Sequence, residues 1–89
     1  MLHKIKLDIS FCTPVNNGEK PFEIRKNDRG FQKGDLVQFV PVKNGIETHH
    51  PIEVKTFKIT YVMNGYGIEN GFCVFGIKPY DERRAEFEY

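Results

Sequence analysis

The segment 18–25, GEKPFEIR, places two basic residues and one acidic residue at close spacing. If the glycine turn leads into a strand, Lys20, Glu23 and Arg25 would surround one cleft with an ammonium, a carboxylate and a guanidinium. A guanidinium offers a planar fork of N–H donors to a phosphate or a base edge, and a carboxylate can orient it or accept a proton. The same residues also fit a surface ion pair on a solvated strand face, and spacing alone favours that simpler interpretation.

Basic residues are concentrated in the first part of the chain. Residues 1–34 carry seven Lys and Arg against four Asp and Glu, whereas the whole chain carries 13 against 12, a net charge of +1. The excess of basic over acidic residues is greatest between positions 20 and 33. The basic residues there are Lys20, Arg25, Lys26, Arg29 and Lys33. The near-neutral total excludes a strong overall field toward nucleic acid or membranes, so an anion site must be local.

Acidic and cysteine residues elsewhere give weaker signals for a metal site. Glu53 and Lys55 have the E-x-K spacing of metal-dependent nucleases, with Asp35 upstream as a partner, but alternation along one strand often produces that spacing by chance. Cys12 and Cys73 have no second Cys or His at metal-ligand spacing, and Cys73 in FCVF is predicted to be buried packing. We therefore expect neither a metal nor a cofactor.

Histidine and aromatic residues outside this segment have simpler structural interpretations. His49 and His50 are adjacent, and neighbouring residues of a strand point in opposite directions, which argues against joint chelation. Phe31, Tyr61 and Tyr66 could each stack on a base, but packing in the core or in a loop explains them more simply.

Eighty-nine residues are enough for one domain with one core and one shallow cleft. The dominant hydrophobic period is two, which is typical of half-buried strands. In the second predicted strand, Phe22 and Ile24 should face inward, with Glu23 and Arg25 on the opposite face. The predicted strands cover residues 3–9, 20–25, 36–42, 52–63 and 72–77.

Proline and glycine residues predict where these elements end. Thr13 would cap a short helix with Pro14 at its first position and Gly18 just past its end. Pro41 has no N–H for a ladder, so its strand should end there or lie at a sheet edge.

Turn signals complete the predicted architecture. Asn44-Gly45 predicts a hairpin, and a change of hydrophobic parity in 52–63 predicts a bulge near Lys55-Thr56 or two strands bent at a corner. The expected fold is mainly β with one or two short helices (α+β), a small open or closed barrel in residues 1–79, followed by a charged tail at 80–89.

The N-terminal residues MLHKIKLDIS contain no apolar stretch of signal-peptide length, and no apolar run is long enough to span a bilayer. Two cysteines allow at most one intramolecular bridge, far from a disulfide framework. These features predict a cytoplasmic protein with reduced thiols.

Gly18, Lys20, Glu23 and Arg25 resemble the GxKxxExR signature of ASCH domains, which are members of the PUA-like superfamily. The longer string FEIRKNDRGFQKGD, with IEVK, ITYV and GFCVFGIK, is similar to a small bacterial and phage family of unknown function in that superfamily. The resemblance covers about residues 3–78. It implies a small pseudo-barrel with a short helix beside a cleft, and recognition of RNA or a modified nucleotide.

Some ASCH relatives are amidohydrolases of an acetylated cytidine that use a Lys, a Thr nucleophile three positions later and a distant Glu. Lys20 matches that lysine, but Glu23 occupies the threonine position, and a carboxylate does not replace a hydroxyl nucleophile. Nuclease activity is also known for some ASCH domains.

The sequence therefore predicts a binding module for RNA or a modified nucleotide. Lys20, Arg25, Lys26 and Arg29 would contact phosphates or a base, and Glu23 would fix the polar geometry. Two alternatives remain open. One is a small hydrolase or ribonuclease with Lys20 and Glu23 as its acid–base pair, and the other is a protein-interaction module that uses an exposed strand edge or the tail 80–89.

Overall fold

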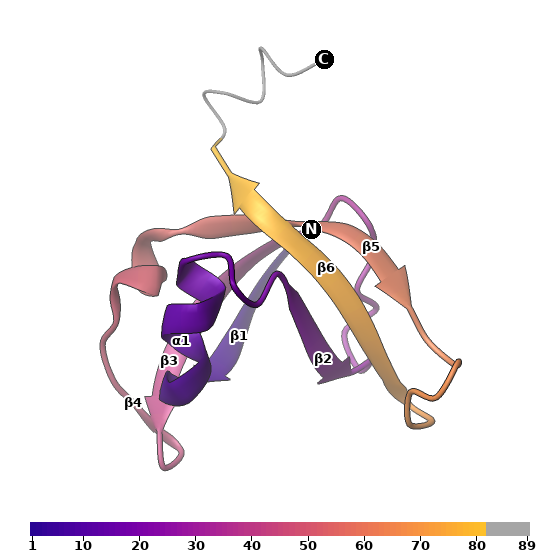
Figure 1. Ribbon diagram of the computed structural model, residues 1–89, viewed down its shortest axis with the longest axis horizontal. Coiled ribbons are helices and arrows are strands. Elements are labelled where there is room, and N and C mark those ends of the chain that lie inside the picture. The colour runs from indigo at the N-terminus through magenta and orange to yellow at the C-terminus, as the bar shows by residue number, and fades with distance from the viewer. Residues whose placement is uncertain (82–89) are drawn as a thin grey trace.

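The computed structural model describes residues 1–81 (Figure 1). Within this range, a mixed sheet of six strands carries one α-helix and one short 3₁₀ helix, as expected for a mainly β, α+β fold. The elements are, in chain order, β1 (Leu2–Asp8), α1 (Ile9–Asn16), β2 (Phe22–Lys26), β3 (Leu36–Lys43), β4 (Ile46–Glu47), η1 (Pro51–Val54), β5 (Thr56–Met63) and β6 (Phe72–Tyr80).

The strands follow the order β1-β3-β5-β6-β2, and β4 pairs with β3 outside this path. β1 and β3 are parallel, and the other pairs are antiparallel. β1 and β2 are the two edges, and within the described residues no backbone ladder joins them. The predicted β-rich fold is confirmed, but the sheet is bent without closing into a barrel, with β5 and β6 arching across it in Figure 1.

The hydrophobic core fills the inside of the bent sheet and the contact with α1. On β1, Ile5 and Leu7 are buried and alternate with exposed polar residues, as the period of two predicts. The central strands, α1 and η1 supply most of the remaining buried residues: Cys12, Val15, Val37, Phe39, Ile52, Phe57, Ile59, Cys73, Phe75 and Ile77. Both cysteines are free and buried, so they act as small apolar core residues.

Helix α1 begins earlier than the sequence predicts. Asp8, rather than Thr13, is its N-cap: the Asp8 carboxylate accepts a hydrogen bond of 3.0 Å from the Ser10 N–H. Ile9, predicted to end a strand, is therefore the first helical residue, and Pro14 lies inside the helix. The helix ends near Gly18, as predicted, where a φ of +86° suits a residue without a Cβ.

Pro41 neither ends β3 nor lies at an edge, because β3 continues to Lys43 and lies between β1 and β5. The Pro41 carbonyl accepts a hydrogen bond of 2.9 Å from the Thr48 N–H. Since the N and C=O of a strand residue point to the same side, the proline nitrogen faces away from β1 and breaks no bond of that ladder. The hairpin at Asn44-Gly45 is confirmed, with φ of 52° and 78° at the two residues.

The change of parity before β5 has a different cause from the one predicted. Pro51–Val54 form η1, so there is no bulge at Lys55-Thr56, where β5 begins. The bulge lies further along, between Ile59 and Tyr61. A Cβ on Gly76 of β6 would come 2.5 Å from Thr60 Oγ1, so the glycine gives the bulged residue room.

The C-terminal strand β6 passes through Pro79 and reaches Tyr80, the first residue of the predicted tail. The remainder of that prediction, from residue 82 to 89, lies outside the described residues. Among residues 1–81, no helix has the length and apolar character needed to cross a membrane.

Candidate functional site

Edge strand β2 has its polarity reversed relative to a normal half-buried strand. Glu23 is 3% exposed, whereas Phe22 and Ile24 are 40% and 58% exposed. The prediction that Phe22 and Ile24 face inward is therefore wrong. Exposing apolar side chains and burying a carboxylate both oppose folding. Stability therefore does not explain the arrangement of β2, and this strand is the first place to look for a functional site.

The buried carboxylate of Glu23 is held between two cations. Lys20 Nζ lies 2.5 Å from Glu23 Oε1, and Arg25 Nε lies 2.9 Å from Glu23 Oε2. Both partners are largely covered, with 21% and 24% of their side chains exposed. The structure thus brings together the three residues that the GEKPFEIR spacing selects, and it replaces the surface ion pair with a largely buried one.

Arginine side chains connect the two sheet edges. The Arg25 guanidinium donates to the Lys6 carbonyl, and Arg29 Nη1 donates to the Lys4 carbonyl at 2.7 Å. Both acceptors belong to β1, so guanidinium groups bridge the gap that no backbone ladder closes. Arg25 and Arg29 are therefore partly engaged in holding the cleft.

Lys20 is positioned by the turn after α1 and by two aromatic rings. Its backbone N–H donates to the Pro14 carbonyl at 3.0 Å, and its Nζ donates to the Phe22 carbonyl at 3.2 Å. The same Nζ lies 4.7 Å from the ring centroid of Phe11 and 5.1 Å from that of Phe22. Cation–π attraction therefore adds to the ion pair with Glu23.

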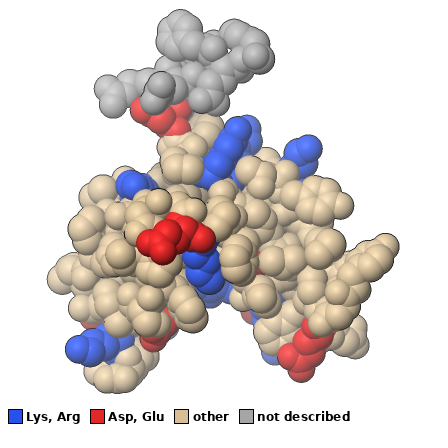
Figure 2. All heavy atoms as spheres, viewed as in Figure 1, with Lys and Arg blue, Asp and Glu red and all other residues tan. Residues whose placement is uncertain are grey.

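These groups line a cleft of about 440 Å³ between the edges β1 and β2, which we call the β1–β2 cleft. Its lining includes four basic and two acidic residues, and it combines charged groups with exposed aromatic rings. The residues are Lys6, Leu7, Asp8, Phe11, Lys20, Phe22, Glu23, Ile24, Arg25, Lys26 and Phe72. Figure 2 shows basic and acidic groups interspersed on the displayed face, without a large area of one sign. This face therefore carries no broad basic surface.

The remaining predicted site residues lie around this cleft. Lys26 lines it and is exposed, and its side chain forms no hydrogen bond or ion pair with another described residue. Arg29 lies outside the lining and acts through the bridge to Lys4. Sequence reasoning missed Phe11 because it placed the helix too late; the Asp8–Ser10 capping pattern was the available signal.

Glu53 and Lys55 of the E-x-K pattern and Asp35 each bind a different partner. The His50 N–H donates to Glu53 Oε2 at 3.1 Å as part of the η1 cap, and this bond lowers the pKa of Glu53. Lys55 Nζ donates to the Asn16 carbonyl at 3.1 Å, and Asp35 Oδ2 lies 2.8 Å from His3 Nε2. No group of three or more potential metal ligands occurs among residues 1–81.

The other histidine, aromatic and cysteine candidates lie outside the β1–β2 cleft. His50 caps η1, with its Nδ1 accepting a hydrogen bond of 3.0 Å from the Ile52 N–H. Phe31 is buried, with its ring centroid 4.7 Å from that of His3, whereas Tyr61 and Tyr66 are exposed. Burial raises the pKa of both cysteine thiols, which makes them poor nucleophiles near neutral pH.

Comparisons with known proteins give a family and a fold. Residues 2–77 match the model of a family described as a domain of unknown function, DUF3850. No curated protein matches the chain. The crystal structure of hypothetical protein PH0355 is similar, with a TM-score of 0.60 and 15% sequence identity over 90% of this chain and 100% of that one. At this identity, the likeness concerns the fold alone.

Proposed function

Because this chain belongs to the DUF3850 family, a family of unknown function, we propose a function from the geometry of the β1–β2 cleft: it binds a nucleotide of RNA or a modified nucleotide. The reversed polarity of β2 carries this proposal. It exposes Phe22 and Ile24 and buries Glu23 between two cations, an arrangement that a ligand in the cleft would complete.

The cleft offers the contacts that a nucleotide requires. Phe11 and Phe22 flank the Lys20 ammonium, so a base can stack on an exposed ring while its phosphate approaches the ammonium. Lys26 is a second cation without a protein partner among the described residues. Glu23 holds Lys20 and Arg25 in place, and this fixed arrangement lowers the entropy lost on binding.

The unpaired strand edges add hydrogen-bonding groups. The Lys6 and Phe22 carbonyls accept bonds from side chains rather than from a neighbouring strand. The N–H and C=O of a strand residue point to the same side, so the Lys6 N–H faces the cleft, and Ile24, two residues after Phe22, presents its backbone there as well. Backbone donors and acceptors of this kind can bind base edges.

The resemblance of the sequence to ASCH domains also supports this proposal. The ASCH signature residues Gly18, Lys20, Glu23 and Arg25 surround the cleft or its entrance turn, and a short helix lies beside a bent sheet. Both features support membership of the PUA-like superfamily, whose theme is RNA or modified-nucleotide recognition.

A hydrolase or ribonuclease in the same cleft is the alternative outcome. Lys20 already donates to Glu23 and to the Phe22 carbonyl, so Lys20 and Glu23 form a closed pair rather than a free base and a free acid. Binding without turnover therefore fits this geometry better.

The test is a titration with short labelled RNAs and free nucleosides at low and moderate salt. We expect saturable binding that weakens about tenfold or more in Lys20→Ala and Arg25→Ala, with a log–log salt slope of about 0.7 for each phosphate contacted. Lys33→Ala, an exposed cation outside the cleft lining, is the matched control and should bind like the unaltered protein.

Product analysis of the same mixtures separates binder from enzyme. Cleaved product that disappears in Lys20→Ala would establish the enzyme alternative. Absence of binding to every RNA and nucleoside would refute the proposal and favour a protein partner at the exposed edge.

A further inference from the structure

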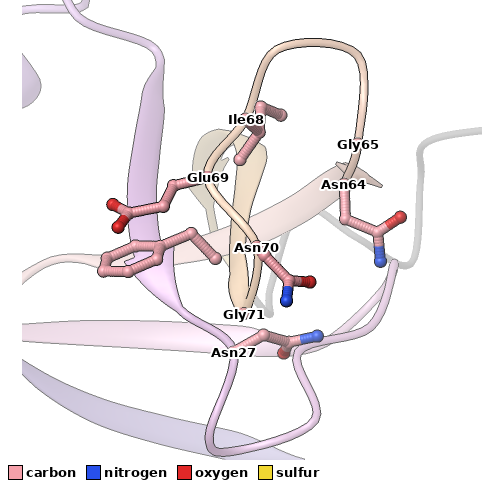
Figure 3. Close-up of a pocket in the computed structure, with 8 residues that line it drawn as sticks. Asn27, Asn64, Gly65, Ile68, Glu69, Asn70 and Gly71 are labelled. Carbon is pink, nitrogen blue, oxygen red and sulfur yellow. The ribbon is translucent and has the colours of Figure 1, made fainter.

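A second hollow lies beside the β1–β2 cleft, between the end of β2 and the β5–β6 loop (Figure 3). Its volume is about 500 Å³, and its lining residues are Asn27, Asn64, Gly65, Ile68, Glu69, Asn70, Gly71 and Phe72. Phe72 also lines the β1–β2 cleft, and Lys26 of that cleft directly precedes Asn27. The two hollows are therefore neighbours. We call the second one the amide pocket.

Three asparagine side chains characterise the amide pocket. In Figure 3, the amide groups of Asn27, Asn64 and Asn70 lie on one side of the loop, whereas the Glu69 carboxylate points to the other side. All three asparagines are exposed, and none of their amides is hydrogen-bonded to another residue in the range 1–81. Their hydrogen-bonding groups are available to a ligand.

Backbone bonds hold the loop that carries these amides. The Ile68 N–H donates to the Gly65 carbonyl and the Phe72 N–H to the Glu69 carbonyl, both at 3.0 Å. The Asn27 N–H donates to the Gly71 carbonyl at 2.9 Å, which joins the loop to β2. The amides are thus presented by a fixed backbone without being needed to stabilise it.

The charge of the pocket indicates which ligand it suits. Its lining contains no lysine or arginine and one carboxylate, so it is a poor phosphate site. An amide group offers a donor and an acceptor side by side, the pattern that the edge of a nucleobase matches. Unstacked bases of single-stranded RNA are recognised in this way.

We propose that the amide pocket is a second nucleotide subsite for single-stranded RNA. One nucleotide occupies the β1–β2 cleft, and the base of the adjacent nucleotide binds Asn27, Asn64 and Asn70. The linking phosphate lies at Lys26, the exposed cation between the two hollows. This inference rests on the proposed function, which it extends from one nucleotide to two.

The experiment compares the four nucleoside 5′-monophosphates with the sixteen 5′-phosphorylated dinucleotides by calorimetric titration. Both probes then carry a 5′-phosphate for Lys20, and only the dinucleotides carry the linking phosphate and the second base. At least one dinucleotide should bind about tenfold more tightly than either of its monophosphates, since an amide–base pair discriminates by roughly that factor. The double variant Asn64→Ala/Asn70→Ala should remove this gain and leave monophosphate affinity unchanged. Gln32→Ala, an exposed amide outside the pocket, should have no effect.

The outcomes separate the two proposals. Equal affinity for mono- and dinucleotides, or a gain that survives the double variant, would overturn the second subsite and leave the cleft intact. A gain that the double variant removes but Lys20→Ala does not weaken would keep the amide pocket and reject the cleft. Binding of neither probe would overturn both. Unchanged thermal melting of the double variant shows that lost affinity is not lost folding.

Discussion

The two edge strands of the sheet use the same alternating pattern in opposite ways. On β1, Ile5 and Leu7 face the core and Lys4 and Lys6 face outward. On β2, the apolar residues are exposed and Glu23 is buried. The difference indicates that β1 is built for folding and that β2 holds a charged cluster at the cost of exposing apolar surface.

The comparison is most sharply tested by truncating an apolar residue on each edge. Leu7→Ala should lower the free energy of unfolding by about 3 to 4 kcal/mol, because Leu7 is 2% exposed and its loss leaves a cavity. Ile24→Ala should change it by less than about 0.5 kcal/mol, because Ile24 is largely in solvent. Urea unfolding of both variants measures the difference, and equal losses would show that β2 packs like β1.

Removing the buried carboxylate is expected to have the next largest effect. Glu23→Ala leaves Lys20 and Arg25 next to each other without their counter-ion, and should destabilise the protein by about 2 to 3 kcal/mol. The effect lies at the low end for a buried pair because both cations retain some contact with water. Glu47→Ala, an exposed acidic residue of β4, is the control and should leave the unfolding midpoint unchanged.

A result for Glu23→Ala as small as that for Glu47→Ala would reduce the cluster to a surface ion pair. Glu23→Gln adds a second measurement, since it keeps the shape and one acceptor while removing the charge. The free energy of unfolding of Glu23→Gln should lie between that of the unaltered protein and that of Glu23→Ala.

Alternation along the chain predicts where the strands lie but not which way an isolated edge strand faces. β1 is identified correctly because Ile5, Leu7 and Ile9, the last of which begins the helix, alternate with charged residues. In β2, two apolar residues alternate with two charged ones, so the pattern is nearly symmetric. The deciding partner, Lys20, comes from the preceding turn, whose course depends on where α1 ends.

The residues of the candidate site likewise divide into those that the sequence predicts and those that it misses. The GEKPFEIR spacing selects the three residues that meet, whereas Lys6, Phe11 and Phe72 come from distant elements that only the folded chain brings to the cleft. The amide pocket has no local sequence signal, because Asn27 follows β2 whereas Asn64 and Asn70 lie in the distant β5–β6 loop. Local patterns thus identify chemistry within one strand and miss chemistry assembled between strands.

The arginine bridges between the edges should contribute less than the buried cluster. Arg29→Met removes one charged hydrogen bond to the Lys4 carbonyl at an exposed position, and should cost about 0.5 to 1 kcal/mol. Its larger effect should be local, with faster amide hydrogen exchange than in the unaltered protein at His3 and Ile5, whose N–H groups face β3. Exchange that accelerates equally in β5 would mean that the bridge stabilises the whole fold instead.

A fall in pH should reduce stability mainly through two aspartates next to β1, Asp8 and Asp35. Hydrogen bonds from the Ser10 hydroxyl and N–H lower the pKa of Asp8 at the end of β1. Burial acts to raise the pKa of Asp35, but hydrogen bonds from His3 and from the Gln32 N–H more than offset it, so this pKa is lowered too. A lowered carboxyl pKa contributes stability above the unfolded-state value, and this stability is lost as the pH falls through the folded-state value.

The unfolding midpoint should therefore decrease slightly as the pH falls below about 4, the range in which unfolded aspartates titrate. Asp8→Asn and Asp35→Asn should each flatten this decrease and have a smaller effect at pH 3 than at pH 7, because the removed carboxylate is already being protonated. Thermal melting from pH 2.5 to 7 measures the slope. A slope that persists in the combined variant Asp8→Asn/Asp35→Asn would assign the acid sensitivity to other carboxyl groups and would weaken the contrast between the two edges.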